Sequence, residues 1–383
     1  MASIWNKGLC VSIFGESHGE SVGVVIDNVP PGIEIDFERV EKFLSRRAPL
    51  RHKVGSTSRT EFDKFKVLSG IFKGKTSGTP ICAITPNEDF RPGDYEAIEF
   101  LARPGHADIT GSIRYKFSND PRGGGHFSGR LTAPITFAGA ICEQILELKG
   151  IRTFAHISSI GDIKDLKFCT KKPTITQLED MSTKSIAVLD DSIIAPITEK
   201  INRLAEEGDS VGGTVECVIL GVPAGIGSPI FDGIENHISC LAFGIPGVKG
   251  IEFGAGFACA KMLGSENNDE FYIEDEKIRT KTNNHGGILG GISSGMPIIF
   301  NVAIKPTPTI SKKQKTVNLK TLKSQEISAH GRHDSCIAIR AVPVVESVAN
   351  IAILSQIIYQ GEFFFFFFCE ILCHQKKRLR AKA

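Results

Sequence analysis

Residues 120–150, DPRGGGHFSGRLTAPITFAGAICEQILELKG, join a glycine-rich turn to a long helix. Three consecutive glycines, Gly123 to Gly125, let the backbone approach a ligand with no side chain in between. The run from Thr132 to Lys149 predicts a helix, and Gly150 is typical of the position where a helix ends. This segment therefore predicts a glycine-rich loop suited to binding a ligand, followed directly by a long helix.

The other predicted helices and strands do not alternate regularly along the chain. Further helices are predicted at residues 37–45 (with Asp36 as N-cap), 193–207 and 342–356, and strands at 11–14, 23–26, 214–220 and 297–304, with a flexible turn at 286–291. A doubly wound parallel sheet requires regular alternation of strand and helix. We therefore predict an α+β fold.

Composition and charge exclude several classes of protein. The 383 residues are 41% hydrophobic and 23% charged, which is ordinary for a globular chain of one or two domains. A net charge of +2 gives no general electrostatic case for binding nucleic acid. Ten cysteines are scattered singly without CxxC spacing, and the N-terminus lacks a secretory signal pattern. We expect a reduced, cytoplasmic protein with no metal site and no nucleic-acid partner.

Two runs of the sequence are basic and contain no acid. Residues 43–60 hold five arginines and lysines, and residues 311–325 hold five lysines. Each run is either a solvated loop or a surface that binds a small molecule with several negative charges.

Three distant segments each place a histidine within two residues of a glycine. They are GESHG (15–19), RPGHAD (103–108) and GRHD (331–334). A histidine beside arginine and carboxylate groups has a shifted pKa that suits proton transfer. We therefore predict one site that is assembled from across the chain.

Two motifs resemble well-known ligand or nucleophile loops. Residues 15–19 match the G-x-S-x-G elbow of serine hydrolases, but the β-branched residues 22–26 that follow are a poor helix start. Ser17 as a nucleophile, Ser17 as a capping residue, and His18 as a proton donor or phosphate ligand all stay open. Residues 70–76 have one residue fewer than a P-loop, so we interpret them as a turn, and no dinucleotide-binding G-x-G-x-x-G is found.

Taken together, the motifs resemble the chorismate synthase family over about residues 5 to 355. The matching segments are FGESHG (14–19), VPPG (29–32), RPGHAD (103–108), RGGG (122–125), GDSVGG (208–213), GVPAG (221–225), HGGILGGI (285–292), KPT (305–307), GRHD (331–334) and RAVP (340–343). The resemblance implies a layered β-α-β sandwich with helices between antiparallel sheets, and a homotetramer. It also implies a single catalytic domain over residues 1–360.

The last residues, 361–383, form an atypical tail with six phenylalanines at 363–368 and a basic end. Glutamine and glutamate residues interrupt its apolar run, so we expect no membrane span. No function is inferred from this tail.

The resemblance implies a carbon–oxygen lyase of the shikimate pathway, in aromatic amino acid biosynthesis. The family converts 5-enolpyruvylshikimate 3-phosphate to chorismate by 1,4-anti elimination of phosphate and the C6 proton. Reduced FMN is required without net redox change, and its N5 takes the proton while the protein holds it against the substrate. Whether NADPH reduces the flavin on this chain or an external flavin reductase does so stays open.

The resemblance also assigns roles to individual residues. His18 would act as general acid toward the departing phosphate, His106 would set the protonation of the flavin, Asp334 would lie near flavin N5, and Ser17 would hydrogen-bond nearby. The substrate-binding arginines would be Arg46, Arg47, Arg103, Arg130 and Arg340. The flavin-binding residues would be Ser128, Gly247, Gly290, Lys305, Pro306, Thr307 and Arg332. We expect the Lys305 loop to meet the flavin phosphate and the run 312–323 to form a mobile lid.

The chain departs from the family pattern directly after the glycine triplet. His126 and Phe127 stand where the family usually has an arginine and a serine that contact flavin. A histidine cannot make the forked contact of a guanidinium, which predicts weaker flavin binding. A protein that binds FMN without catalysing the reaction therefore stays open as an alternative. Gly247 in place of the usual alanine is a milder change.

Overall fold

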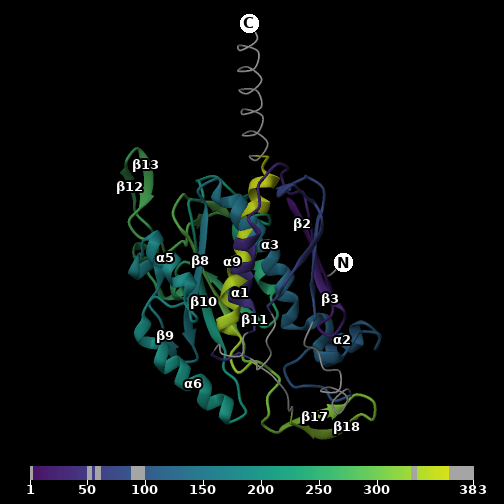
Figure 1. Cartoon of the computed structure of the whole chain (residues 1–383). Coiled ribbons are helices and arrows are strands. Elements are labelled where there is room, and N and C mark those ends of the chain that lie inside the picture. Colours follow the sequence, from purple (N-terminus) through teal and green to yellow (C-terminus); the bar gives the residue numbers. More distant parts are fainter. Residues whose placement is uncertain (1–2, 50–53, 57–61, 88–99, 329–333, 362–383) are drawn as a thin grey trace.

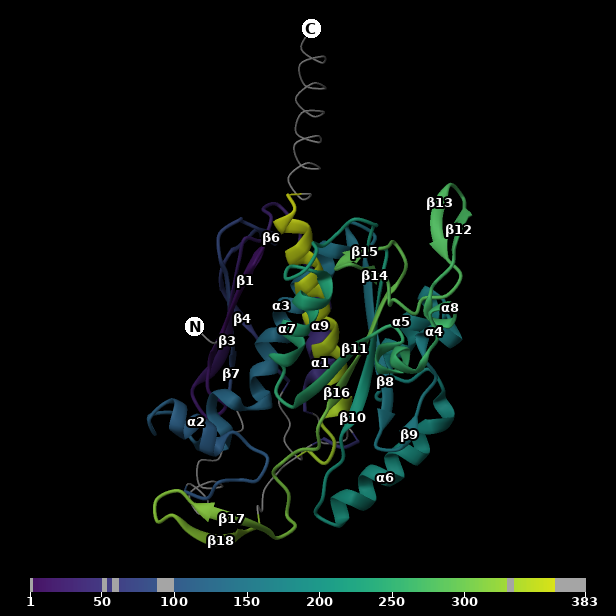
Figure 2. The same ribbon diagram turned by 180° about the vertical axis from the view of Figure 1, so that it is seen from behind.

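Two five-stranded sheets lie on either side of a layer of helices (Figure 1). The computed structural model describes residues 3–49, 54–56, 62–87, 100–328 and 334–361. Viewed from behind, the same three layers are seen with their order reversed (Figure 2). The predicted α+β class and the layering of helices between antiparallel sheets are both confirmed.

The first sheet is built from the N-terminal part of the chain, with strand order β1-β2-β3-β7-β4. Its strands are β1 (Ile4–Lys7), β2 (Leu9–Gly15), β3 (Ser21–Asp27), β7 (Ile81–Pro86) and β4 (Lys66–Ser69). All of these neighbours are antiparallel. The predicted strands at 11–14 and 23–26 are the paired strands β2 and β3.

The second sheet has strand order β11-β16-β10-β8-β9, again with antiparallel neighbours. Its strands are β11 (Val248–Phe253), β16 (Ile298–Ile304), β10 (Gly213–Leu220), β8 (Arg152–Ile160) and β9 (Ile163–Lys164). The predicted strands at 214–220 and 297–304 are β10 and β16, which pair with each other at the centre of this sheet.

Four helices fill the layer between the sheets. They are α1 (Phe37–Arg47), α3 (Thr132–Glu147), α7 (Ile234–Phe243) and α9 (Ala338–Tyr359). Helices α3 and α9 contact each other and strands of both sheets, while α1 packs on both helices. A Cβ atom added to Gly139 of α3 would lie 2.2 Å from the Cβ of Ser347 in α9, so glycine permits this close approach.

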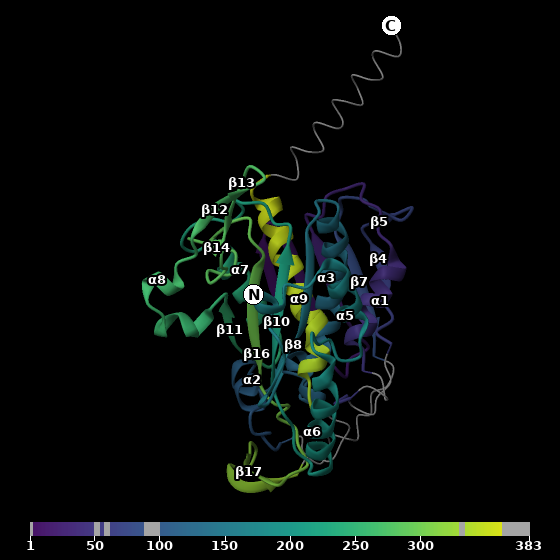
Figure 3. The same ribbon diagram turned by 90° about the vertical axis from the view of Figure 1, so that its left-hand side faces the viewer.

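Helix α9 runs through the middle of the molecule (Figure 3). Among the described residues it is the one helix long and apolar enough to cross a membrane, and 94% of its most apolar window is buried inside the protein. A helix that is apolar on all sides is expected in a core of this kind. Its bounds extend the predicted helix at 342–356 by four residues at the start and three at the end.

The other predicted helices agree closely with the structure. Helix α1 begins at Phe37 as predicted and ends two residues later than expected, and the Oδ1 atom of Asp36 accepts hydrogen bonds from the backbone N–H groups of Glu38 and Arg39, at 2.9 and 3.2 Å. Helix α3 begins at Thr132 and ends two residues early. The helix at 193–207 is α6 (Ile194–Glu206).

The turn predicted at 286–291 is a small hairpin. Strands β14 (Ile288–Leu289) and β15 (Ile292–Ser293) pair around Gly290 and Gly291, so the prediction of a flexible turn was incomplete. The segment 70–76 is the hairpin of β5 (Ile71–Phe72) and β6 (Lys75–Thr76), which confirms a turn there and excludes a P-loop.

The remaining elements lie around the three layers. They are α2 (Asp108–Arg114), η2 (Arg122–Phe127), η3 (Gly129–Leu131), α4 (Phe168–Lys171), α5 (Ile175–Thr183), η4 (Asp191–Ile193), η5 (Gly256–Lys261), α8 (Gly264–Asn267), and the hairpins β12 (Phe271–Glu274) with β13 (Lys277–Thr280) and β17 (Gln314–Asn318) with β18 (Lys323–Ile327). The two hairpins lie at opposite ends of the molecule in Figures 1 and 2.

Candidate active site

A cavity of about 490 Å³ is lined by residues that come from as far apart in the chain as Ser17 and Val344. Thirteen of the predicted site residues line it: Ser17, His18, Arg47, Arg103, His106, Ser128, Arg130, Gly247, Lys305, Pro306, Thr307, Asp334 and Arg340. The volume lies in the range of small-molecule and cofactor sites. The structure therefore brings the three histidine-containing motifs, where they are described, to one place.

The glycine triplet forms the wall between the two predicted catalytic histidines. Gly123 and Gly124 have φ values of +59° and +97°, which favour glycine. A Cβ atom on Gly123 would lie 2.1 Å from Cε1 of His18, and one on Gly124 would lie 2.8 Å from Nε2 of His106. Glycine is required here both for the backbone conformation and to make room for the imidazole rings.

Ser17 fixes the orientation of His18. The Ser17 hydroxyl donates to the carbonyl oxygen of Arg122 at 3.2 Å, and its Oγ lies 3.1 Å from Nδ1 of His18. Since the hydroxyl has one proton and directs it to Arg122, Nδ1 of His18 is the donor to Ser17. His18 itself is only 3% exposed.

The same geometry argues against a nucleophilic Ser17. A serine nucleophile directs its proton to the histidine, and its elbow leads from a strand into a helix. Here the hydroxyl proton goes to a backbone carbonyl, and the elbow leads from strand β2 to strand β3. The serine-hydrolase alternative therefore lacks both its hydrogen bond and its helix.

His106 forms a compact cluster with Asp108 and Arg103. Nδ1 of His106 lies 2.6 Å from Oδ1 of Asp108, and Arg103 donates to both carboxylate oxygens of Asp108 at 2.7 and 2.8 Å. Burial opposes ionisation of Asp108, but the hydrogen bonds from Arg103 and His106 outweigh it and hold the pKa of this carboxyl well below its usual range. Asp108 is thus ionised at neutral pH.

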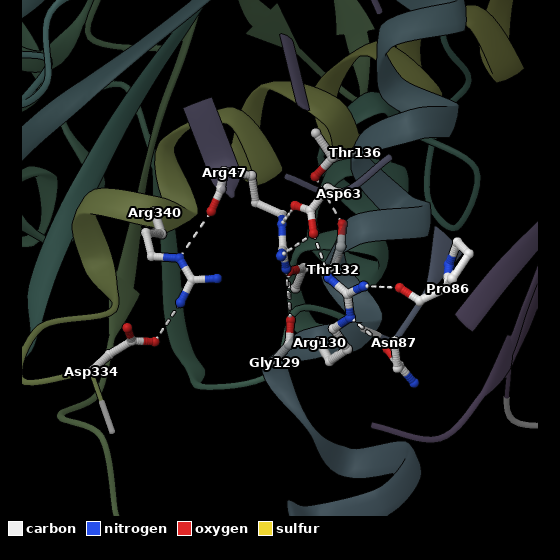
Figure 4. Close-up of polar contacts among 10 residues, drawn as sticks. All are labelled: Arg47, Asp63, Pro86, Asn87, Gly129, Arg130, Thr132, Thr136, Asp334 and Arg340. Atoms are coloured by element: carbon white, nitrogen blue, oxygen red, sulfur yellow. Dashed lines mark hydrogen bonds and ion pairs between the residues drawn. The ribbon is translucent and has the colours of Figure 1, made fainter. Parts of the chain in front are cut away.

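A group of arginines surrounds another part of the cavity (Figure 4). Arg47 donates from Nε and Nη2 to the two oxygens of Asp63 at 2.7 and 3.0 Å, and Arg130 donates to Oδ1 of the same carboxylate. Arg340 donates to Asp334 at 2.6 Å and to the carbonyl oxygen of Arg47 at 2.9 Å. Three predicted substrate-binding arginines are therefore held by buried or half-buried acceptors.

The wall formed by residues 304–309 suits a ligand that carries a phosphate and hydrogen-bonding groups. Lys305 donates to the carbonyl oxygen of Gly105, and burial together with the neighbouring Lys249 lowers the pKa of its ammonium group. Oγ1 of Thr307 is buried and has no hydrogen-bond partner among the described residues. Such an orphaned polar atom on a cavity wall is satisfied when a ligand binds. The residues present fit a flavin nucleotide in this respect.

Two of the other predicted site residues, Arg46 and Gly290, do not line the cavity. Arg46 donates to the buried carboxylate of Glu346, with one contact at 2.9 Å, so its guanidinium points into the helical layer instead. Gly290 lies in the turn between β14 and β15, and no atom of the described residues lies within 4 Å of a Cβ atom placed on it. Arg332 lies outside the described residues, as do Arg51, Lys53 and Arg59 of the first basic run.

The two residues that depart from the family pattern both line the cavity. The ring of His126 is held between the carbonyl oxygen of Gly15, 2.9 Å from Nδ1, and Oγ of Ser3, 2.7 Å from Nε2. Both ring nitrogens are thus engaged by the protein. The ring of Phe127 packs against Gly111 and lies 6.2 Å from the ring of Tyr115.

Asp63 is the buried partner of two cavity arginines, and sequence reasoning missed it. It lies in a stretch without glycine or histidine, TEFDKF, and nothing in the local pattern distinguishes it from a surface aspartate. The one signal was the group of arginines earlier in the chain, because buried arginines require a carboxylate partner.

Comparisons with known proteins agree with one another. A family model described as chorismate synthase matches residues 9–358. The chain is 46% identical to a chorismate synthase of Pyrococcus abyssi over 352 residues, which covers 92% of this chain and 96% of that one. It is 44% identical to a chorismate synthase of Methanocaldococcus jannaschii over 360 residues, with 92% and 95% covered.

A solved structure gives the same result for the fold. A crystal structure of chorismate synthase superimposes with a TM-score of 0.72 at 25% sequence identity, covering 92% of both chains. The match extends over both sheets and the helices between them. The chain therefore belongs to the chorismate synthase family.

Proposed function

We propose that this chain is a lyase that converts 5-enolpyruvylshikimate 3-phosphate to chorismate and phosphate. The observation that carries the proposal is the convergence of His18, His106 and four arginines on one cavity in a member of this family. The reaction breaks the C6–H bond and the C3–O bond to phosphate, and a second ring double bond forms. Proton transfer and binding of anions are therefore the tasks of the protein.

The charges of the cavity match those of this substrate. The substrate has one phosphate and two carboxylate groups, and Arg47, Arg103, Arg130, Arg340 and Lys305 all line the cavity. Arginine binds phosphate and carboxylate groups through forked, charge-assisted hydrogen bonds. The arginines are also held in place before the substrate arrives, which reduces the entropic cost of binding.

The two histidines have separate roles in proton transfer. When protonated, His18 donates a proton to the departing phosphate, while Ser17 keeps its ring oriented through Nδ1. His106 donates a hydrogen bond from its Nδ1–H group to ionised Asp108, so Nε2, beside Gly124, is the nitrogen that would exchange a proton in the cavity. Asp334, held by Arg340, accepts and returns protons nearby.

We propose that the cavity binds reduced FMN next to the substrate. Lys305, Thr307, Ser128 and Gly247 would hold it, as the lysine charge and the orphaned hydroxyl of Thr307 support. When bound, reduced FMN supplies electron density for breaking the C–O bond and a base for the C6 proton. NADPH on this chain or an external flavin reductase would reduce it.

The proposal includes a cytoplasmic homotetramer with a basic lid. Hairpin β12–β13 exposes Phe271, Ile273 and Ile278, each more than 60% accessible, and apolar side chains of this kind suit contact between subunits.

Hairpin β17–β18 carries Lys315 and Lys323, and Thr316 Oγ1 donates to the carbonyl oxygen of Ala102, next to Arg103 of the cavity. This position supports a lid role for residues 312–323.

The test is an anaerobic assay with 5-enolpyruvylshikimate 3-phosphate and FMN reduced in advance. We expect chorismate absorbance and phosphate release to rise together in a 1:1 ratio. Binding of FMN without phosphate release would instead support the inactive flavin-binding alternative raised by His126 and Phe127. Repeating the assay with oxidised FMN and NADPH distinguishes reduction by this chain from reduction by an outside enzyme.

A further inference from the structure

Asp63 is a buried carboxylate that two cavity arginines share. Its side chain is 0% exposed, and those of Arg47 and Arg130 are 2% and 8% exposed. Arg47 donates to both oxygens of this one carboxylate, and Arg130 donates to Oδ1, which the two arginines therefore share (Figure 4). The two guanidinium groups come from different elements, since Arg47 ends α1 and Arg130 belongs to η3.

The remaining hydrogen bonds fix both guanidinium planes from the protein side. Arg47 donates from Nη1 to Oγ1 of Thr132 at 3.0 Å. Arg130 donates from Nε to Oδ1 of Asn87 at 2.8 Å and from Nη2 to the carbonyl oxygen of Pro86 at 3.0 Å. With these acceptors and Asp63 in place, neither side chain can rotate without losing several charge-assisted hydrogen bonds.

The electrostatics of this group depend on Asp63. Complete burial opposes its ionisation, but the charges of Arg47 and Arg130 outweigh burial and hold the pKa of Asp63 below its usual value. Burial lowers the pKa of Arg47 to about 10 against the attraction of Asp63, with repulsion from Arg340 and Arg130 adding to the effect. Asp63 and Arg47 are therefore both charged at neutral pH.

We propose that Asp63 is a positioning residue that holds Arg47 and Arg130 at a fixed spacing, so that an oxyanion of the substrate meets two oriented guanidinium groups. The inference rests on the proposed function for the identity of the substrate. Asp63 does not line the cavity, so it acts only through the arginines. Two mutually repelling cations would otherwise have to be brought together each time an anion binds.

Two other roles for Asp63 make different predictions. If Asp63 served stability alone, its loss would lower the melting temperature and leave anion affinity unchanged. If it served only to weaken the positive field, its loss would strengthen anion binding. Of the three roles, only positioning predicts that anion binding becomes weaker when the negative charge of Asp63 is removed.

The experiment compares Asp63→Asn, which keeps shape and removes the charge, with Asp165→Asn. The side chain of Asp165 is also 0% exposed, and it lies 2.9 Å from a ring nitrogen of His156, away from the cavity. Melting temperature and circular dichroism report folding. Isothermal titration with inorganic phosphate gives the anion Kd without any need for turnover, and steady-state kinetics of chorismate formation give KM and kcat.

We expect Asp63→Asn to weaken phosphate binding and raise the substrate KM by about tenfold each, with a smaller change in kcat, since each tenfold corresponds to one lost charge-assisted hydrogen bond. Asp165→Asn is expected to lower the melting temperature and leave both constants unchanged. Phosphate affinity in Asp63→Asn that equals or exceeds that of the wild type would overturn the inference.

Two further arms keep the result decisive. If Asp63→Asn does not fold, Thr132→Val removes the shorter of the two remaining hydrogen bonds of the Arg47 guanidinium and is expected to weaken phosphate binding severalfold, whereas unchanged affinity would count against positioning. If the wild type binds phosphate, Asp63→Asn weakens that binding and neither protein forms chorismate, the proposed function is refuted and the positioning role stays supported.

Discussion

Nδ1 of His106 lies 2.6 Å from Oδ1 of Asp108, two residues further along the chain. An ionised carboxylate can only accept hydrogen bonds, so this contact places the ring proton on Nδ1 and leaves Nε2 available on the cavity side. Arg103 in turn keeps Asp108 ionised. The RPGHAD segment thus contains a histidine, the group that orients it and the group that keeps that carboxylate charged.

Replacing either histidine is expected to stop catalysis without unfolding the protein. His106→Ala and His18→Ala should each lower turnover by roughly 10²–10⁴-fold, the usual contribution of a positioned general acid or base. The assay is chorismate formation with reduced FMN, and the melting temperature serves as the control for folding. Unchanged turnover in either variant would remove that histidine from the mechanism.

The glycine wall between the histidines should tolerate no side chain. In Gly123→Ala the new Cβ would lie 2.1 Å from the ring of His18, so the ring must move and turnover should fall at least tenfold. Gly74→Ala is the matched control, because Gly74 also has positive φ, +76°, but has nothing within 4 Å of the added atom. Both variants are expected to lose about 1 kcal/mol of stability from the backbone conformation. Equal activity in the two would show that the clash has no effect on His18.

The buried His156 should make stability depend on pH. Its two nitrogens lie 2.9 Å from Asp165 and 3.0 Å from Glu216. Burial opposes its charge, but the hydrogen bonds to these carboxylates outweigh burial and raise its pKa above 6.5. A raised histidine pKa gives a contribution that is fully present below about pH 6.5 and is lost as pH rises through the folded-state pKa.

Urea unfolding of wild type and His156→Gln between pH 6 and pH 9 measures this contribution. At pH 6 the variant should be less stable by about 3 kcal/mol, because two buried carboxylates lose their cation. The difference should shrink steadily toward pH 9. A difference that stays constant over this range would mean that His156 is not charged in the folded protein.

The N-cap of α1 gives a prediction of stability alone. Asp36→Ala removes the side-chain acceptor for two backbone N–H groups, at an expected cost of about 1 kcal/mol in the free energy of unfolding. The backbone of Asp36 keeps its hydrogen bonds with the Gln144 side chain, at 2.8 and 3.0 Å, so α1 should stay docked on α3. The measurement is a urea unfolding midpoint, and a variant as stable as the wild type would contradict the capping role.

The sequence predicted best those helices and strands that are determined by residues close together in the chain. Helix α1 has a capping aspartate and one apolar face, so the sequence predicted its first residue and its length to within two residues. Helix α9 is buried on nearly all sides, which removes the periodicity that marks helix ends. The hairpin at Gly290 has strands of only two residues, and these are stabilised by pairing that no sequence pattern reveals.

The candidate site was likewise predicted only where a local sequence motif marks its residues. His18 and His106 lie in glycine-rich motifs that marked them as candidates, and both line the cavity, whereas Asp63 has no such neighbours and could be recognised only once Arg47 and Arg130 were placed. Arg46 was assigned to the cavity with Arg47, but successive helix residues point about 100° apart, and here Arg47 alone of the two lines the cavity. Arg46 pairs with Glu346 instead.

Helix α9 is the last described element to leave the ribosome, and it fills the middle of the molecule. Until it emerges, the apolar inner faces of two finished sheets have no partner, and Arg340 and Asp334 are missing from the catalytic cavity. Such exposed surfaces invite aggregation or chaperone binding during synthesis. The nascent chain should therefore gain its protease resistance and its catalytic capacity together, in a single late step.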